Sequence, residues 1–356
     1  MNRAAPHRGM KAAGILVLLN GFYIRGGLYA GGRDAWLSAL AAAALLCPVA
    51  LWLGWLARRG RSFFAALEEA LPPFAAGAVT ALTLPAALAA AVLTVRSFTV
   101  FVQSNILAAT PQSWIAAFLL AAALMQVKAG RRVFGDWCFI VLWLTAGLIA
   151  VLIAFSVSRF DWSNLRPVLA APASFGACTL RIFTGWLGTL LLLFPLFSGS
   201  EEGSPFLPCI LTAGLVTAAV FAANTLILSA AVTGTVRYIT YYAASVIGIG
   251  DFFQHVEILS AFVFQMTSTA ALTAELLFIC QGLVSLFRLP DERVTAVPAA
   301  LLIYALHACL RYSGAEALAG AGPARTVLPL ILFLLLPAAA SLPGRRIGHR
   351  RPKNRL

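Results

Sequence analysis

The stretch NGFYIRGG, residues 20–27, interrupts the first apolar segment of the chain with three glycines, an amide and an arginine. Such residues in the middle of a membrane segment favour a break in the helix. A break leaves backbone N–H and C=O groups unpaired in lipid, so it persists only where protein, water or a ligand satisfies them. The stretch therefore predicts a ligand site inside a membrane domain.

The composition agrees with a membrane domain, because 61% of residues are hydrophobic, 11% are charged and the mean hydropathy is +0.88. Apolar runs separated by charged residues, proline and glycine predict ten transmembrane spans: 12–29, 36–57, 74–105, 112–127, 133–156, 177–197, 207–232, 252–287, 295–312 and 326–343. We expect a single transmembrane domain over residues 1–343 and a basic cytoplasmic tail over 344–356.

The third and eighth spans are much longer than the others and take the third place in two groups of five. Because five is odd, the two groups cross the membrane in opposite directions. The prediction is an all-α integral membrane protein with an inverted five-plus-five repeat, over residues 12–156 and 177–343. Such repeats break the first helix of each half, and the sixth span carries FTGWLGT, residues 183–189, at the equivalent place.

The two breaks define the predicted ligand site. The carbonyl end of a half-helix attracts an ammonium group or cation and the N–H end attracts a carboxylate, so a zwitterionic amino acid suits both. The candidate ligand-binding residues are Asn20, Gly21, Gly26, Thr184, Gly185 and Trp186. Alternatively, glycines in membrane helices only allow close helix packing.

Span eight carries acids that suggest a pathway. In IGIGDFFQHVEIL, residues 247–259, Asp251 and Gln254 form a capping pair, whereas Glu257 is expected about two turns inside the helix. A carboxylate at that depth should find a cation or be protonated. The candidate cations within spans are Arg25, Arg96 and Arg181.

Glu275 follows Glu257 after about five helical turns, so the two acids share a face, with Ser268 near that face between them. The predicted pathway or gating residues are Arg25, Glu257 and Glu275. Alternatively, both acids lie at opposite interfaces of a long helix and face water.

Charge and motifs exclude several classes. The net charge of +13 is spread over connections and the tail without aromatic interleaving, which favours cytoplasmic termini and contact with lipid over nucleic acid. The six cysteines form no CxxC pair, and no Walker loop, HExxH, GxSxG or GxGxxG is present. We therefore predict no metal, no cofactor and no enzymatic activity.

Five segments carry a family resemblance: DAW at 34–36, TPQSW at 110–114, NLRPVL at 164–169, FP at 194–195 and GDFFQHVEIL at 250–259. In this order and context the chain resembles the spore germination permease family, the GerB or GerAB-type B subunits within the amino acid, polyamine and organocation transporter superfamily. The resemblance implies an amino acid permease-like fold and a nutrient germinant receptor subunit in the inner membrane of a bacterial spore, with larger A-type and lipoprotein C-type partners.

The chain departs from the family pattern where Trp186 follows Gly185, a place where many relatives have an acid, and around GGLYAGG, residues 26–32. Trp186 either closes the pocket over a bulkier or less cationic ligand or packs against lipid. The resemblance implies a receptor whose occupancy by a small nutrient triggers germination. The alternatives are a secondary amino acid transporter coupled to H⁺ or Na⁺, which shares the fold, and a scaffold that only supports the other subunits.

Overall fold

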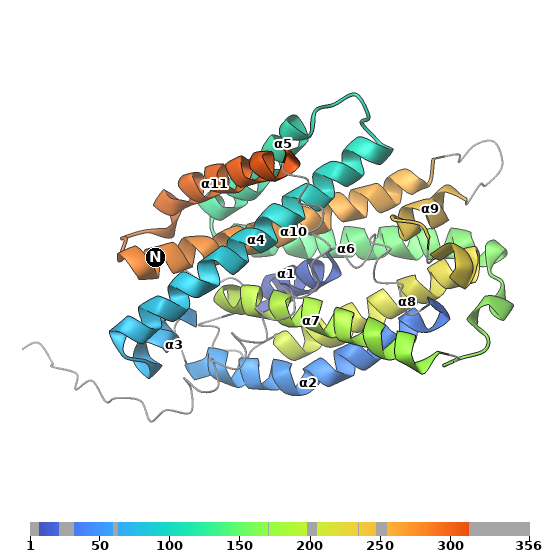
Figure 1. The fold of residues 1–356 in the computed structure, drawn as a ribbon, viewed down its shortest axis with the longest axis horizontal. Helices are drawn as coiled ribbons and strands as arrows, with labels where there is room; N and C mark the ends of the chain where they lie inside the picture. The colour runs from blue at the N-terminus through green and yellow to red at the C-terminus, as the bar shows by residue number, and fades with distance from the viewer. Residues whose placement is uncertain are drawn as a thin grey trace, which may run out of the picture.

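The computed structural model describes residues 7–20, 32–59, 63–169, 171–197, 205–233, 235–246 and 255–312. In this part the chain is a bundle of α-helices (Figure 1). The helices are α1 (His7–Leu19), α2 (Ala35–Arg59), α3 (Phe63–Ala70), α4 (Pro73–Asn105), α5 (Gln112–Ala129), α6 (Arg131–Ser156), α7 (Pro172–Phe197), α8 (Phe206–Thr233), α9 (Ile239–Ser245), α10 (Glu257–Phe287) and α11 (Glu292–Tyr312). Two 3₁₀ turns, η2 (Val157–Arg159) and η3 (Trp162–Leu165), connect α6 to α7.

Eight of these helices are long and apolar enough to cross a membrane: α2, α4, α5, α6, α7, α8, α10 and α11. They coincide with predicted spans two to nine, which confirms an all-α integral membrane protein. The thirteen residues of α1 extend only about 20 Å, less than the hydrocarbon core. The rest of the first predicted span, and the tenth span at 326–343, lie outside the described residues.

The two predicted helix breaks have different outcomes. α1 ends at Leu19, so the helix stops where the stretch 20–27 begins. In contrast, α7 is helical throughout, including residues 183–189, so the unwinding predicted there is wrong. The hydroxyls of Thr184 and Thr189 donate to the carbonyls four residues earlier, each at 2.9 Å. α7 stays helical through its glycines because the hydrogen bonds within the helix pair the backbone N–H and C=O groups, which would be unpaired in lipid if the helix unwound.

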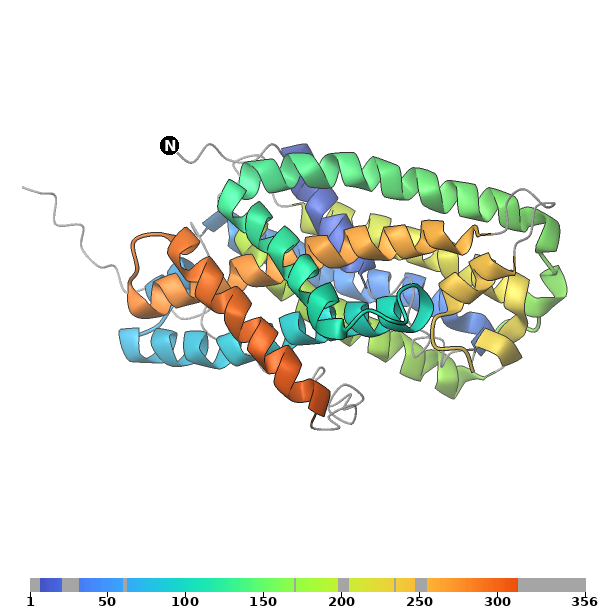
Figure 2. The same cartoon turned by 90° about the horizontal axis from the view of Figure 1, so that it is seen from above.

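Two short helices that the sequence did not predict emphasise the repeat. α3 directly precedes α4 in the first half, and α9 precedes α10 in the second half. The helices that follow them, α4 with 33 residues and α10 with 31, are the longest of the described chain. α2 packs extensively on α8, and α4 on α10, so equivalent members of the two halves contact each other (Figures 1 and 2).

The short helices lie at opposite ends of the bundle (Figure 1). We call the end with α3 the Arg131 end, because α6 begins there, and the end with α9 the Asp34 end, because α2 begins there. Each short helix packs its aromatic residues on the long helix of the other half. The rings of Phe63 and Phe64 lie 5.7 and 5.2 Å from that of Phe278 in α10.

At the Asp34 end the arrangement is matched. The rings of Tyr238, which precedes α9, and of Tyr241 within α9 lie 5.0 and 5.4 Å from Phe101 in α4. Phe264 of α10 completes the cluster at 5.1 Å from Phe101. The two halves are therefore joined crosswise at both ends of the bundle.

Glycines permit the closest contacts between helices. Replacing a glycine with alanine should therefore lower stability where the helices touch and raise it where space is open. A Cβ atom at Gly214 of α8 would lie 2.5 Å from the Cβ of Ala43 in α2, whereas a Cβ at Gly147 of α6 would have no neighbour within 4 Å. We expect Gly214→Ala to lower the free energy of unfolding by about 1–3 kcal/mol through overpacking. Gly147→Ala should raise it by roughly 0.5–1 kcal/mol through helix propensity. Thermal unfolding of both variants in one detergent measures the difference, and shifts of equal sign would refute the close contact.

Candidate functional site

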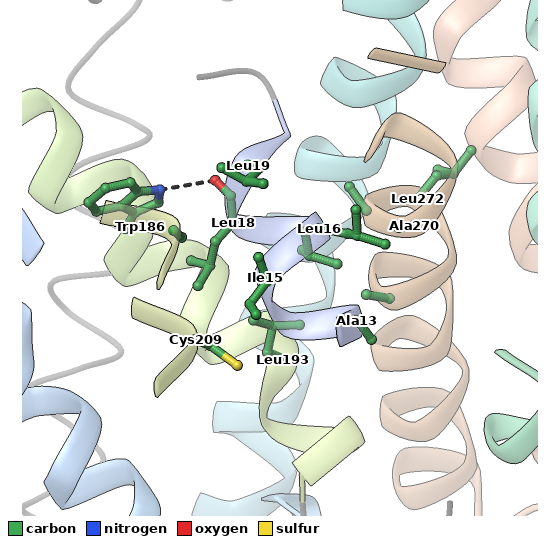
Figure 3. Close-up of a cluster of buried hydrophobic side chains, with 14 of the residues drawn as sticks. Ala13, Ile15, Leu16, Leu18, Leu19, Trp186, Leu193, Cys209, Ala270 and Leu272 are labelled. Atoms are coloured by element: carbon green, nitrogen blue, oxygen red, sulfur yellow. Dashed lines mark hydrogen bonds between the residues drawn. The ribbon is translucent and has the colours of Figure 1, made fainter. Parts of the chain in front are cut away.

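The C-terminal end of α1 lies inside the bundle, with α7 on one side and α10 on the other (Figure 3). The last carbonyls of a helix have no partner within the helix and must find one elsewhere. The indole Nε1 of Trp186 donates a hydrogen bond of 3.0 Å to the carbonyl of Leu18 (Figure 3). Trp186 is 0% exposed, so it does not pack against lipid. The residue instead joins α7 to the end of α1.

Asn20 joins the same end of α1 to α10. Its backbone N–H bonds the carbonyls of Leu16 and Val17 at 3.1 and 3.2 Å, which closes the last turn. Its side-chain Oδ1 accepts a hydrogen bond of 3.1 Å from the hydroxyl of Ser268, a buried residue of α10. Three helices that are distant in sequence therefore meet at the end of α1.

The other predicted ligand residues are only partly brought to this place. Thr184 bonds the Leu180 carbonyl of its own helix, and the Gly185 carbonyl accepts from Thr189 in the same helix. Gly21 and Gly26 lie outside the described residues, as does Arg25. The structure thus brings Asn20 and Trp186 to one site and adds Ser268, which the sequence suggested only as part of a polar face.

Glu275 belongs to a buried polar cluster nearer the Arg131 end of α10. Its Oε1 accepts a hydrogen bond of 2.9 Å from the hydroxyl of Thr94 in α4, and Glu275 is only 7% exposed. Two residues earlier, on another side of α10, Thr273 donates to Oε1 of Gln126 in α5 at 2.8 Å. Of the two alternatives for this acid, the interior of the bundle is correct and the water-facing interface is wrong.

Glu257 lies elsewhere, at the Asp34 end. α10 begins at this residue, so the expectation that Glu257 lies two turns inside the helix is wrong. Its Oε1 is 3.0 Å from Nδ1 of His255, whose side chain is 75% exposed. Burial, reinforced by the charge of Glu257, raises the pKa of the Tyr241 phenol in α9. Asp251 and Gln254 lie outside the described residues.

The predicted cation partners of Glu257 are not found beside it in the described part of the chain. The guanidinium of Arg96 donates to the carbonyl of Leu310 in α11, and Arg181 is exposed on α7. The imidazole of His255 is the ionisable partner of Glu257 that the structure shows. The two acids of α10 therefore have separate surroundings, about 27 Å apart along the helix.

At the Arg131 end, one arginine ties several helices together. Nη2 of Arg131 lies 2.7 Å from Oε1 of Glu292 at the start of α11, and Nη1 donates to the carbonyl of Pro195 in the last turn of α7 at 3.2 Å. Gln281 of α10 donates to the other oxygen of Glu292 at 3.3 Å. From the sequence Arg131 counted only among the basic residues that indicate topology, and Glu292 had no predicted role, because their pairing depends on helices far apart in the chain.

This ion pair should show measurable coupling. The side chains of Arg131 and Glu292 are 31% and 27% exposed, so water screens the pair partly and we expect a coupling energy of only about 1 kcal/mol. A double-mutant cycle with Arg131→Gln and Glu292→Gln, followed by thermal unfolding, measures it. Purely additive losses would show that the two side chains do not interact in solution.

Comparisons with known proteins agree with this architecture. The crystal structure of MhsT in complex with L-phenylalanine matches with a TM-score of 0.58 and 14% sequence identity, over 86% of this chain and 80% of that chain. At this identity the likeness shows the fold alone, that of a transporter with inverted repeats. No curated protein sequence matches the chain.

A family model described as spore germination protein matches residues 21–311. The match begins two residues after Leu19, the last residue of α1, and includes the other helices of the described chain except for the last residue of α11. It also includes all five segments that carried the resemblance. The chain belongs to the spore germination protein family.

Proposed function

We propose that the chain is the nutrient-binding B subunit of a germinant receptor, and that a small nutrient binds beside the end of α1. The observation that carries this proposal is the meeting of α1, α7 and α10, where Trp186 holds the Leu18 carbonyl and Ser268 holds Asn20. A helix end inside a membrane bundle is costly unless its polar groups have a use or a partner. Two polar side chains from other helices hold this end in place.

The chemistry of the site favours a ligand with an ammonium group. The C-terminal end of α1 carries partial negative charge, which attracts a cation. The hydroxyl of Ser268 and the amide of Asn20 can orient polar groups of the ligand, while the fully buried Leu16, Leu18 and Trp186 make the surroundings of the helix end apolar. The complex of MhsT with L-phenylalanine supports an amino acid as the class of ligand.

Binding would signal by shifting the balance between two arrangements of the helices, because a ligand with equal affinity for both shifts nothing. In this proposal the buried Glu275, together with Glu257 and Arg25, serves a pathway or gate that responds to occupancy. The protein would act in the inner membrane of the spore with A-type and C-type subunits, and both termini would face the spore core. The basic residues of the predicted connections support this orientation.

Two kinds of variant test the site. Ser268→Ala removes a hydroxyl and should weaken nutrient binding about five- to tenfold, the loss of one hydrogen bond. Gly185→Leu adds a bulky side chain and should abolish the nutrient response while the protein still accumulates. Gly147→Leu is the control, since open space surrounds Gly147. Equilibrium binding of a labelled amino acid panel to the reconstituted protein gives the affinities. Unchanged affinity in both site variants would refute the proposed location.

The same vesicles separate the receptor from the alternative, a secondary transporter with the same fold. Saturable binding without accumulation, with or without the partner subunits, supports the receptor. Accumulation driven by a proton or sodium gradient establishes a transporter. If pocket variants behave normally and only surface variants fail to assemble with the partner subunits, the chain is a scaffold.

A further inference from the structure

Arg131 connects three helices that have little packing on one another. α6, α7 and α11 each pack on α10, but in the described chain they have at most isolated direct contacts among themselves. At the Arg131 end, the guanidinium of Arg131 in α6 contacts both Glu292 in α11 and the carbonyl of Pro195 in α7. One side chain of the first half thus joins two helices of the second half to α6.

The position of Arg131 is not explained by its own helix. Arg131 is the first residue of α6, and the partial positive charge at a helix N-terminus disfavours a cation there. Its partners on the other helices favour the charge instead. The carbonyls in the last turn of α7 need donors from outside that helix, and Glu292 is the first residue of α11. The guanidinium therefore lies between the negative end of α7 and an acid, which offsets the cost at α6.

Two buried side chains of α10 adjoin the ion pair. Gln281 donates to Oε2 of Glu292, but its own Oε1 is buried and has no hydrogen-bond partner among the described residues. Buried polar atoms are nearly always paired, so this oxygen is explained if water reaches it in a second arrangement of the helices. The neighbouring thiol of Cys280 is 0% exposed and lies beside Thr295, close enough to Glu292 for the carboxylate charge to act on it.

From these contacts we propose that Arg131 and Glu292 form a latch, which holds the Arg131 end of the bundle closed. When the ion pair breaks, α6, α7 and α11 separate at this end while each still packs on α10. The strength of the pair suits such a role. The two side chains are 31% and 27% exposed, so water competes with the pair and opening needs little free energy. A fully buried pair would be much harder to separate.

The latch shares two helices with the end of α1. α7 carries Trp186 and α10 carries Ser268, and both residues hold that end through hydrogen bonds. Movement of α7 against α10 would therefore change these contacts, and a ligand there would in turn favour one state of the latch. This link to a ligand rests on the proposed function. The latch itself needs no ligand, so its test is independent of nutrient binding.

The native Cys280 reports the release of the latch. The full-length protein in nanodiscs is treated with N-ethylmaleimide, an uncharged reagent, and mass spectrometry follows the modification of Cys280 over time. In Arg131→Gln this modification should be about five- to tenfold faster than in the wild type. The rate follows the population of the open arrangement, and a partly exposed ion pair with one further hydrogen bond contributes about this factor. An unchanged rate would overturn the proposal.

The choice of variant and two controls separate a latch from general loosening. Arg131→Gln leaves Glu292 in place, because the charge of that residue acts on the thiol. Arg132→Gln makes the same change of charge at an exposed residue without a hydrogen bond or ion pair in the described chain, and it should leave the rate at Cys280 unchanged. Cys178 in α7, buried near the Asp34 end, should react at the wild-type rate throughout. Equal acceleration at Cys178, or acceleration by Arg132→Gln, would overturn the proposal.

Arg131→Lys is a milder variant, which also decides the question if Arg131→Gln does not accumulate. Lysine keeps the charge that pairs with Glu292, but its single ammonium lacks the fork with which arginine contacts two partners. The ion pair should remain while the contact with the Pro195 carbonyl is lost. The rate of modification at Cys280 should therefore lie between those of the wild type and Arg131→Gln. A rate equal to either of them would contradict a latch that uses both contacts.

Discussion

Replacing Trp186 with alanine should lower the free energy of unfolding by about 3–5 kcal/mol, the usual loss for a large buried aromatic side chain. Trp186 is fully buried, and its indole holds the carbonyl of Leu18 at the end of α1. The substitution removes apolar contacts and also leaves a buried carbonyl without this donor. Unfolding of the purified protein in nanodiscs, followed by heating or denaturant, measures the effect.

Trp186→Phe makes a smaller change, because it keeps a six-membered aromatic ring and removes the donor together with the rest of the indole. We expect the free energy of unfolding of this variant to fall by about 1–3 kcal/mol. The variant should also bind nutrient more weakly, since the end of α1 loses this hydrogen bond to α7. Trp143→Ala is the control, because Trp143 is 67% exposed and such positions usually change stability by less than about 0.5 kcal/mol. Equal losses at Trp143 and Trp186 would contradict the burial that the structure shows.

Phe101→Ala, at the Asp34 end, should lower the free energy of unfolding by a similar amount, about 3–5 kcal/mol. Phe101 is 0% exposed and makes ring contacts with Tyr238, Tyr241 and Phe264. Each such pair contributes about 0.5–1.5 kcal/mol beyond the burial of area. Because α9 is short, loss of these contacts should also free it from α4.

Hydrogen exchange over residues 238–246 measures that release, and thermal unfolding measures the loss of stability. Exchange should become faster in Phe101→Ala, while the matched peptides of α3 at the other end stay unchanged. Phe118→Ala is the control, since Phe118 is 73% exposed on α5. If α9 exchanges at the wild-type rate in Phe101→Ala, its position does not depend on the aromatic cluster.

Much of the fold could be predicted from the sequence, because lipid requires long apolar helices and charged residues mark their ends. The lengths of the third and eighth spans also pointed to the repeat, and α4 and α10 confirm them. α3 and α9 were missed because eight and seven residues are too few to produce a span signal. α8 is interrupted at Ser229, where φ is 64° and ψ is 162°, and this was missed because serine, unlike glycine or proline, is no specific breaker of a membrane helix.

Single residues of the candidate site could be predicted from the sequence, but the contacts between them could not. Asn20 and Trp186 stood out as polar or bulky residues among glycines, but their partners are far along the chain. Trp186 and Leu18 are 168 residues apart, and Ser268 and Asn20 are 248 residues apart. No local pattern encodes such contacts. The break expected at Gly185 was wrong because the intrahelical hydrogen bonds of α7 are complete there.

The crosswise packing of the two halves bears on the order in which the chain folds during synthesis. Phe63 and Phe64 meet Phe278 only after more than half of the remaining chain has been made. Before then the first half exposes an aromatic surface and a helix end that its own residues do not cover. Domains usually fold as units while they are synthesised, starting from the N-terminus. Phe63 also contacts Phe194 of α7, so the cover of α3 arrives in two steps. A ribosome-bound chain that stops after α6 should be sensitive to proteolysis at α3, and full resistance should appear only once α10 has been inserted.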